Sequence, residues 1–261
     1  CPVPRVRQLR YVLGLRRARA DFQRVGGEIV MGEPPLTPED VYRLLAPLYP
    51  DVKSRLLENS KGIPMDCLIA TILSQATNDT LSSIAFQGLK ETFADWDEAL
   101  CSDQSCVEQA IKSGGLYKEK AAAINGVLRK IKDDFGEITL DPLLEMSDED
   151  AFKYLVSLKG VGPKTAACVL AFGLGRPAFP VDTHVLRLAR RIGLVPPTAT
   201  AVRAQQILED ITPSHLKMPL HVTLIEHGRK VCHARNPRCR DCPLWEQCVW
   251  EQKGEKAGPD K

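Results

Sequence analysis

Apolar positions recur with helical spacing along most of the chain. Val41, Leu44, Leu45 and Leu48 share one helical face, and they follow Thr37-Pro38, a pair typical of a helix N-terminus. The same spacing predicts further helices over 64–78, 81–89, 118–132, 148–158, 163–172, 183–191, 205–211 and 218–229. No alternating apolar and polar run, and no Asn-Gly or Asp-Gly turn, favours a β-hairpin. The sequence therefore predicts an all-α fold.

Composition indicates a globular protein, and charge adds two local basic patches. The 261 residues are 44% hydrophobic with a net charge of +2, enough for one large or two medium domains. Residues 1–24 hold seven arginines and one acidic residue, and 229–240 hold five basic residues and no acidic one. Such patches suit phosphate binding, although a solvated arm and a solvated face explain them equally well. The longest apolar stretch, Ala166–Leu174, is too short to cross a membrane, and no secretory signal is expected.

Nine cysteines are present, and four of them crowd into the last thirty residues, which indicates metal ligation in a reducing compartment. These four have the spacing C-x6-C-x2-C-x5-C: Cys232, Cys239, Cys242 and Cys248. Zinc is the usual metal for four cysteines, but zinc folds usually bring two C-x2-C pairs. Ligands that follow one another in one compact loop suit a four-iron four-sulfur (4Fe-4S) cluster. Other cysteines are expected to be small buried residues: Cys67, Cys101, Cys106 and Cys168.

The stretch Ser157–Phe172 reads SLKGVGPKTAACVLAF and predicts two helices joined by a tight turn. Gly160 and Gly162 allow positive φ or close approach to another backbone, and Pro163 fits the first position of the second helix. Exposed N–H groups and the positive end of that helix can hold a phosphate. Taken alone, the pattern is explained equally well by a glycine-rich turn between packed helices.

Two polar residues carry candidate chemistry. Lys164 falls in the first turn of the second helix, where the helix dipole and partial burial favour its neutral amine. A neutral amine is a nucleophile that can form a Schiff base, although an isolated lysine more simply extends its head group into solvent. Asp182 precedes the helix 183–191 and is a candidate N-cap, and the same carboxylate can also face a pocket.

Several short motifs together resemble one known family. Leu158–Ala166 (LKGVGPKTA) and Val181–His184 (VDTH) look like the helix-hairpin-helix and Gly/Pro-rich aspartate signature of DNA glycosylases of the endonuclease III type. The resemblance covers about Pro64 to Cys248 and includes Leu73–Thr77, Gly115–Tyr117 and Glu226–Arg229. It implies that Lys164 is the catalytic amine and Asp182 its helper, and it favours a 4Fe-4S cluster over zinc.

The resemblance also implies a set of DNA contacts. Gln75 would fill the gap that a flipped nucleotide leaves in the duplex, and Leu116 would wedge into the base stack. Judged from the residues alone, Gln75 is equally well a helix cap and Leu116 a core residue. The remaining expected contacts lie in the hairpin and in two later segments: Gly160, Val161, Gly162, Thr165, His184 and Arg229.

The family architecture implies two lobes. Residues 57–175 would form a six-helix barrel domain with the helix-hairpin-helix, and residues 31–56 with 176–250 would form the iron–sulfur cluster domain. Residues 1–30 form an extra basic arm that aids non-specific DNA binding or is disordered, and 251–261 form a polar tail. A monomer is expected.

The predicted function is that of a base-excision repair DNA glycosylase with AP lyase activity on oxidised pyrimidines. Its partner would be double-stranded DNA with damaged bases or abasic sites, with no membrane partner, in the cytoplasm or nucleoid. A mismatch adenine glycosylase is the first alternative, and Lys164 and the end of the chain soon after Cys248 argue against it. A non-catalytic, DNA-damage-binding iron–sulfur protein and a zinc-bound adaptor are the others.

Overall fold

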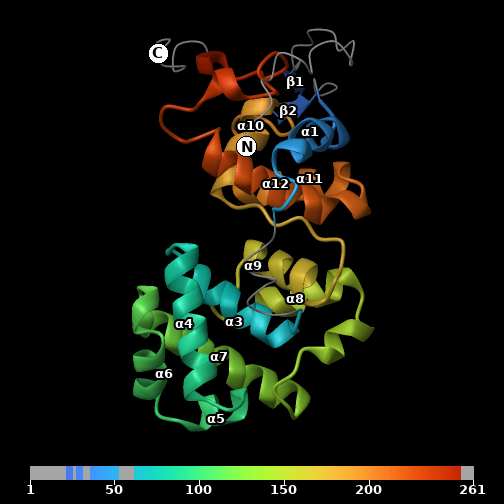
Figure 1. Cartoon of the computed structure of the whole chain (residues 1–261). Coiled ribbons are helices and arrows are strands. Elements are labelled where there is room, and N and C mark those ends of the chain that lie inside the picture. The colour runs from blue at the N-terminus through green and yellow to red at the C-terminus, as the bar shows by residue number, and fades with distance from the viewer. Residues whose placement is uncertain (1–21, 26–27, 32–35, 53–61, 254–261) are drawn as a thin grey trace. The chain divides into compact units, whose positions relative to one another are not determined.

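The computed structural model describes residues 22–25, 28–31, 36–52 and 62–253, and its elements are labelled in Figure 1. The chain divides into two compact units. Lys53–Pro180 is called the central unit below, and Cys1–Val52 with Val181–Lys261 the terminal unit. The junctions expected near residues 57 and 175 stay predictions. Within the described residues the fold is helical apart from one short hairpin, which confirms the all-α class.

The central unit is built around helix α3 (Pro64–Ser74). Every residue from Met65 to Leu73 in this helix is buried, as expected of a helix that is apolar on all sides. Helix α3 packs against several of the other helices of the unit. These are α4 (Asp79–Thr92), α7 (Tyr117–Phe135), α9 (Pro163–Cys168) and the π-helical segment η5 (Val169–Gly173). Helix α8 (Asp148–Ser157) packs against α9 and η5.

Two short helices of the central unit were not predicted. They are α5 (Trp96–Cys101) and α6 (Gln104–Ala110), and each buries a single residue, Ala99 and Val107 respectively. One buried position makes no periodic stripe, so the hydrophobic pattern carried no signal for either helix.

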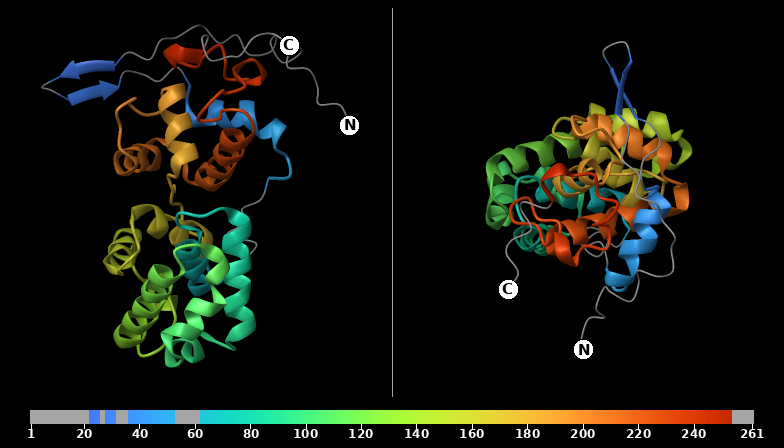
Figure 2. Two further views of the ribbon diagram at one scale, coloured as in Figure 1. Left: turned by 90° about the vertical axis from the view of Figure 1, so that its left-hand side faces the viewer. Right: turned by 90° about the horizontal axis from the view of Figure 1, so that it is seen from above.

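The terminal unit contains a β-hairpin, so the expectation of none is wrong. Strands β1 (Phe22–Val25) and β2 (Glu28–Met31) pair antiparallel, with Phe22 opposite Met31 (Figure 2). The two residues between the strands in the sequence are both glycine, a pair that favours a two-residue hairpin turn as Asn-Gly does. The rest of the basic arm before Phe22, and residues 254–261 of the polar tail, lie outside the described residues.

The remaining helices of the terminal unit are α1 (Pro38–Leu45), α10 (Thr183–Ile192), α11 (Ala201–Ile211) and α12 (Lys217–Lys230). Helix α12 packs against both α1 and α10. Thr37 caps α1 as predicted: its hydroxyl accepts a bond from the Asp40 N–H, and the Asp40 carboxylate accepts one from the Thr37 N–H. Among the described residues, each helix falls short of the length or the hydropathy that crossing a bilayer requires.

Candidate active site

The turn between α8 and α9 depends on one of its two glycines. Gly160 has φ +88°, and a Cβ placed there would lie 3.2 Å from the Cβ of Ala123. Gly162 has φ −92° and open space around it, so nothing in the fold requires glycine there. Val161 is 5% exposed and anchors the turn, while both glycines are exposed. The hairpin turn therefore exposes the backbone of its two glycines, while the buried Val161 side chain holds the turn in place.

Lys164 is the second residue of α9, directly after Pro163 at the first helical position. Its side chain is partly buried, and Thr165 beside it is 4% exposed. The sequence reasoning placed the lysine in the first helical turn, and the helix begins where that reasoning expected. Its role as nucleophile stays a prediction.

Gln75 ends helix α3 and reaches across to the hairpin. Its Nε2 donates to the carbonyl oxygen of Gly160 at 3.1 Å and lies 3.3 Å from Oγ1 of Thr165. Gln75 stands at the C-cap position of α3, yet its side-chain amide bonds to the α8–α9 hairpin rather than to the end of its own helix. The structure thus brings together three of the expected DNA contacts: Gln75, Gly160 and Thr165.

Leu116 is not a core residue, so that alternative is wrong. Its side chain is 54% exposed, and its backbone has φ +47° at the N-cap of α7. A leucine in the left-handed region is strained, and such strain collects at functional sites. The wedge role of Leu116 stays a prediction.

In the terminal unit, Asp182 is the N-cap of α10 as predicted. Its Oδ1 accepts a hydrogen bond from the N–H of Val185 at 2.8 Å, and the side chain is partly buried. The bond fixes the orientation of the carboxylate relative to the helix. Its catalytic role stays a prediction.

His184 and Arg229 belong to the two helices that pack closest in this unit. A Cβ on Gly228 would lie 2.9 Å from the Cβ of His184, so glycine allows α12 to approach α10. Arg187, also on α10, connects the two helices: its Nη2 donates to the Gly228 carbonyl of α12 at 2.9 Å and lies 3.0 Å from Nδ1 of His184. Arg229 is exposed. Sequence reasoning missed Arg187, because nothing local marks an arginine whose partners lie forty residues away.

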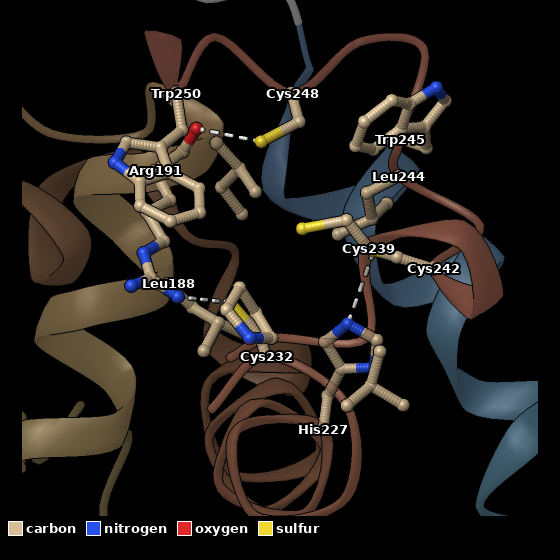
Figure 3. Close-up of a pocket in the computed structure, with 13 residues that line it drawn as sticks. Leu188, Arg191, His227, Cys232, Cys239, Cys242, Leu244, Trp245, Cys248 and Trp250 are labelled. Atoms are coloured by element: carbon tan, nitrogen blue, oxygen red, sulfur yellow. Dashed lines mark hydrogen bonds between the residues drawn. The ribbon is translucent and has the colours of Figure 1, made fainter. Parts of the chain in front are cut away.

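The four clustered cysteines line one cavity in the terminal unit, and Figure 3 shows them around it. The other lining residues are mostly apolar: Leu188, Ile192, Val231, Pro237, Leu244, Trp245 and Trp250, with Arg191 and His227. Cysteines that lie seven, three and six residues apart in the chain therefore face a common space, as their spacing predicted.

Comparison with known proteins decides the family. The family model described as "HhH-GPD superfamily base excision DNA repair protein" matches residues 69–214. The chain is 37% identical to a putative DNA glycosylase of Arabidopsis thaliana over 205 residues, 74% of this chain and 70% of that one. It is 32% identical to endonuclease III of Thermotoga maritima over 207 residues, 79% of this chain and 92% of that one. The chain belongs to the HhH-GPD superfamily of base excision DNA repair proteins.

Solved structures agree with this family. A non-covalent endonuclease III–DNA complex matches with a TM-score of 0.72 at 29% identity, covering 85% of this chain and 98% of that one. A trapped endonuclease III–DNA covalent intermediate matches with a TM-score of 0.73 at 28% identity, covering 85% and 100%. The resemblance to endonuclease III inferred from the motifs is confirmed.

Among the residues that the structure describes, no three His, Cys, Asp or Glu side chains are grouped so that they could hold one metal ion. The four thiols of this HhH-GPD protein line one cavity, and cysteine thiolates are the usual ligands of both structural zinc and a 4Fe-4S cluster. Burial raises the pKa of the Cys242 thiol, so binding of a metal group there must displace a proton.

Arg191 of this HhH-GPD protein supports the cavity from helix α10. Its Nη1 donates to Sγ of Cys232 at 3.2 Å and to the carbonyl oxygen of His233 at 2.8 Å. The guanidinium lies 3.9 Å from the ring centre of Trp250, a stacked cation–π arrangement. Arg191 therefore connects helix α10 to both ends of the cysteine segment, at Cys232 and at Trp250.

A buried hydrogen-bonded chain supports the cavity from the other side. Nδ1 of His227 lies 2.9 Å from the hydroxyl of Tyr49, and Nε2 lies 3.3 Å from Sγ of Cys242. Burial lowers the pKa of His227 to about 4 and raises the pKa of Tyr49 to about 12, so both are neutral. A thiolate at Cys242 would only accept hydrogen bonds, so with a metal group bound Nε2 would carry the proton and Tyr49 would donate to Nδ1. No local pattern in the sequence indicates that Tyr49 and His227, 178 positions apart, form a pair.

The expectation for the other cysteines is only partly right. Cys67 and Cys168 are buried in the central unit. Cys101 and Cys106 are exposed, because they lie on the outward faces of the short helices α5 and α6. The sequence offered no prediction of those helices, so the faces could not be assigned.

Proposed function

We propose that this protein is a bifunctional DNA glycosylase and AP lyase that removes oxidised pyrimidines from duplex DNA through a lysine Schiff base. The observation that carries the proposal is the place of Lys164, in the first turn of α9 directly behind an exposed hairpin turn. Membership of the base excision repair superfamily supports it, as does a covalent intermediate trapped between endonuclease III and DNA.

Lys164 would act as the nucleophile. The lone pair of its neutral amine forms a bond to the sugar C1′, while the glycosidic bond breaks and its electron pair leaves with the base, which takes up a proton. The attached amine loses a proton, the sugar ring opens with protonation of its oxygen, and a protonated imine forms. Removal of a C2′ proton then drives out the 3′ phosphate, which nicks the strand on the 3′ side of the lesion.

Asp182 would orient or deprotonate the lysine, or stabilise positive charge on the sugar. Its carboxylate is held by the N-terminal turn of α10, which supports a fixed position during the reaction. The backbone N–H groups of Gly160 and Gly162 would bind a DNA phosphate without reading sequence, while the N–H of Val161 donates to the Leu158 carbonyl at 3.0 Å and holds the turn. Thr165, His184 and Arg229 are proposed as further contacts.

Gln75 and Leu116 are proposed to occupy the duplex when the damaged base leaves it. Leu116 is exposed and apolar, which suits insertion between bases. Gln75 has a terminal amide that already donates to a carbonyl oxygen, an acceptor of the kind that an unpaired base also offers. Flipping a base costs less when the base is damaged, which supports selectivity for lesions.

Cys232, Cys239, Cys242 and Cys248 are proposed to hold a 4Fe-4S cluster. When bound, the cluster would cross-link the C-terminal loop, a structural rather than chemical contribution. Arg191 and His227 would hydrogen-bond two of its thiolates. The central unit would then correspond to the six-helix barrel domain and the terminal unit to the cluster domain. A brown solution with iron and without zinc would support the cluster, and a colourless zinc protein would contradict it.

Borohydride trapping tests the enzymatic proposal. Duplex DNA with one oxidised thymine or one abasic site is incubated with wild type, Lys164→Gln and the control Lys159→Gln, an exposed lysine in the same hairpin. A covalent adduct with wild type and Lys159→Gln but not with Lys164→Gln is expected. Base release without any adduct would identify water as the nucleophile. Lesion binding with neither release nor adduct would leave a non-catalytic damage-binding protein.

A further inference from the structure

Lys120 is a buried lysine that joins two separate segments of the central unit. The residue is 4% exposed, although lysine is among the side chains least often buried. Its Nζ donates to the carbonyl oxygen of Leu73 at 2.7 Å and to that of Gly114 at 2.8 Å. Hydrogen bonds from an ammonium group at these distances are among the strong ones in proteins.

Both carbonyls stand immediately before segments with strained backbone. Leu73 is in the last turn of α3, three residues before Ala76, which has φ +51°. Gly114 ends a 3-10 turn and is followed by Gly115 at φ +66° and then by the strained Leu116. Positive φ at non-glycine residues persists only where surrounding contacts impose it.

Those two segments carry the residues proposed to enter the duplex. Gln75 lies two residues after the Leu73 carbonyl, and Leu116 lies two residues after the Gly114 carbonyl. The backbone N–H of Lys120 also donates to the Leu116 carbonyl at 2.9 Å, so one residue bonds to three points on the two segments. A single side chain at the start of α7 therefore sets the distance between them.

We propose that Lys120 is a positioning residue that fixes the separation of the Gln75 and Leu116 segments, so that both side chains enter the duplex together during base extrusion. The inference rests on the proposed function of these two residues. It assigns to Lys120 a role in opening the duplex and none in the chemistry on the sugar.

The two substrates of the proposed enzyme separate these roles. A paired oxidised thymine must be extruded before the reaction, whereas an abasic site has no base to unstack. Lys120→Met keeps the length of the side chain and removes all three donors. Lys130→Met is the matched control, because it makes the same change at an exposed position of the same helix.

Single-turnover rates are measured for base release from the oxidised duplex and for strand cleavage at the abasic site. A 2-aminopurine opposite the lesion reports unstacking by its fluorescence. Lys120→Met should lower base release about tenfold to a hundredfold, the loss expected from a misplacement near 1 Å, and should abolish the fluorescence rise. Cleavage at the abasic site should fall far less, and Lys130→Met should match wild type on both substrates.

A purely structural lysine gives a different result. Loss of folded protein lowers both rates in the same proportion, and that outcome, or no change in either rate, would overturn the inference. Failure of wild type itself on both substrates would instead contradict the proposed function. If Lys120→Met does not fold, the same ratio is measured for Lys120→Arg, which keeps the charge but moves the donors, and an unchanged ratio would count against the role.

Discussion

The two glycines of the hairpin turn should respond in opposite ways to a methyl group. Gly160→Ala forces an L-residue to φ +88°, which costs about 1 to 2 kcal/mol in the left-handed region. The new methyl also lies 3.2 Å from the Ala123 methyl, inside the optimal carbon separation, so α7 must yield slightly. We expect a total loss of about 2 kcal/mol in the free energy of unfolding, and a fall of roughly 4–8 °C in Tm.

Gly162→Ala makes the same chemical change two residues away. Its φ of −92° suits alanine, and no atom lies within 4 Å of the added methyl. Its stability should stay the same or rise by about 0.4 to 1 kcal/mol, because the unfolded chain loses freedom. The methyl does project from the proposed phosphate-binding turn, so affinity for duplex DNA should fall.

Urea unfolding followed by circular dichroism gives the stabilities, and fluorescence anisotropy on a lesion-free duplex gives the affinities. The expected pattern is a stability loss at Gly160 and an affinity loss at Gly162. Equal stability losses in the two variants would refute the conformational reasoning. Unchanged affinity in Gly162→Ala would refute the assignment of this turn to a DNA phosphate.

Three further predictions concern other polar residues. Asp182→Asn should keep the hydrogen bond from the Val185 N–H and change the free energy of unfolding by only a few tenths of a kcal/mol, yet slow turnover a hundredfold or more. Asp182→Ala should slow turnover as well and also lose about 1 kcal/mol of folding stability. Thermal unfolding and single-turnover rates check both variants. Tyr49→Phe leaves a buried nitrogen of His227 without its partner and should cost about 1 to 3 kcal/mol in the free energy of unfolding, seen as a lower Tm by circular dichroism. Burial lowers the pKa of Lys120 below its ordinary value of 10.5, so between the folded and the unfolded pKa the unfolded chain binds more protons than the folded chain. The free energy of unfolding should therefore rise with pH over this range in wild type but not in Lys120→Met, and urea titrations at neutral and alkaline pH check this.

Local patterns predicted the parts of this fold that depend on local physics. The cap at Thr37, the cap at Asp182 and the start of α9 at Pro163 follow from side chains that bond within one turn of themselves. The cysteine spacing likewise predicted four thiols around one space, because a short loop limits where they can lie. The family motifs then gave these residues candidate roles.

What the sequence missed depends on distant partners or on weak local signals. Tyr49 and His227 are 178 positions apart, because the whole central unit stands between them in the chain. The buried Lys120 resembled any helical lysine, since its two acceptors are carbonyls that every residue possesses. Leu116 looked like a core leucine because its apolar character gives no indication of a strained backbone.

Helix α10 carries the proposed catalytic carboxylate, Asp182, at its start and a residue that supports the cysteine cavity, Arg191, near its end. It spans ten residues, about 15 Å, from the cap at Asp182 to Arg191 against the Cys232 sulfur. Because Asp182 and Arg191 stand on one short helix, the position of the Asp182 carboxylate is tied to the packing of Arg191 against the cysteine loop. A substitution that moves the cysteine loop would therefore be felt at the carboxylate, at the far end of the same helix.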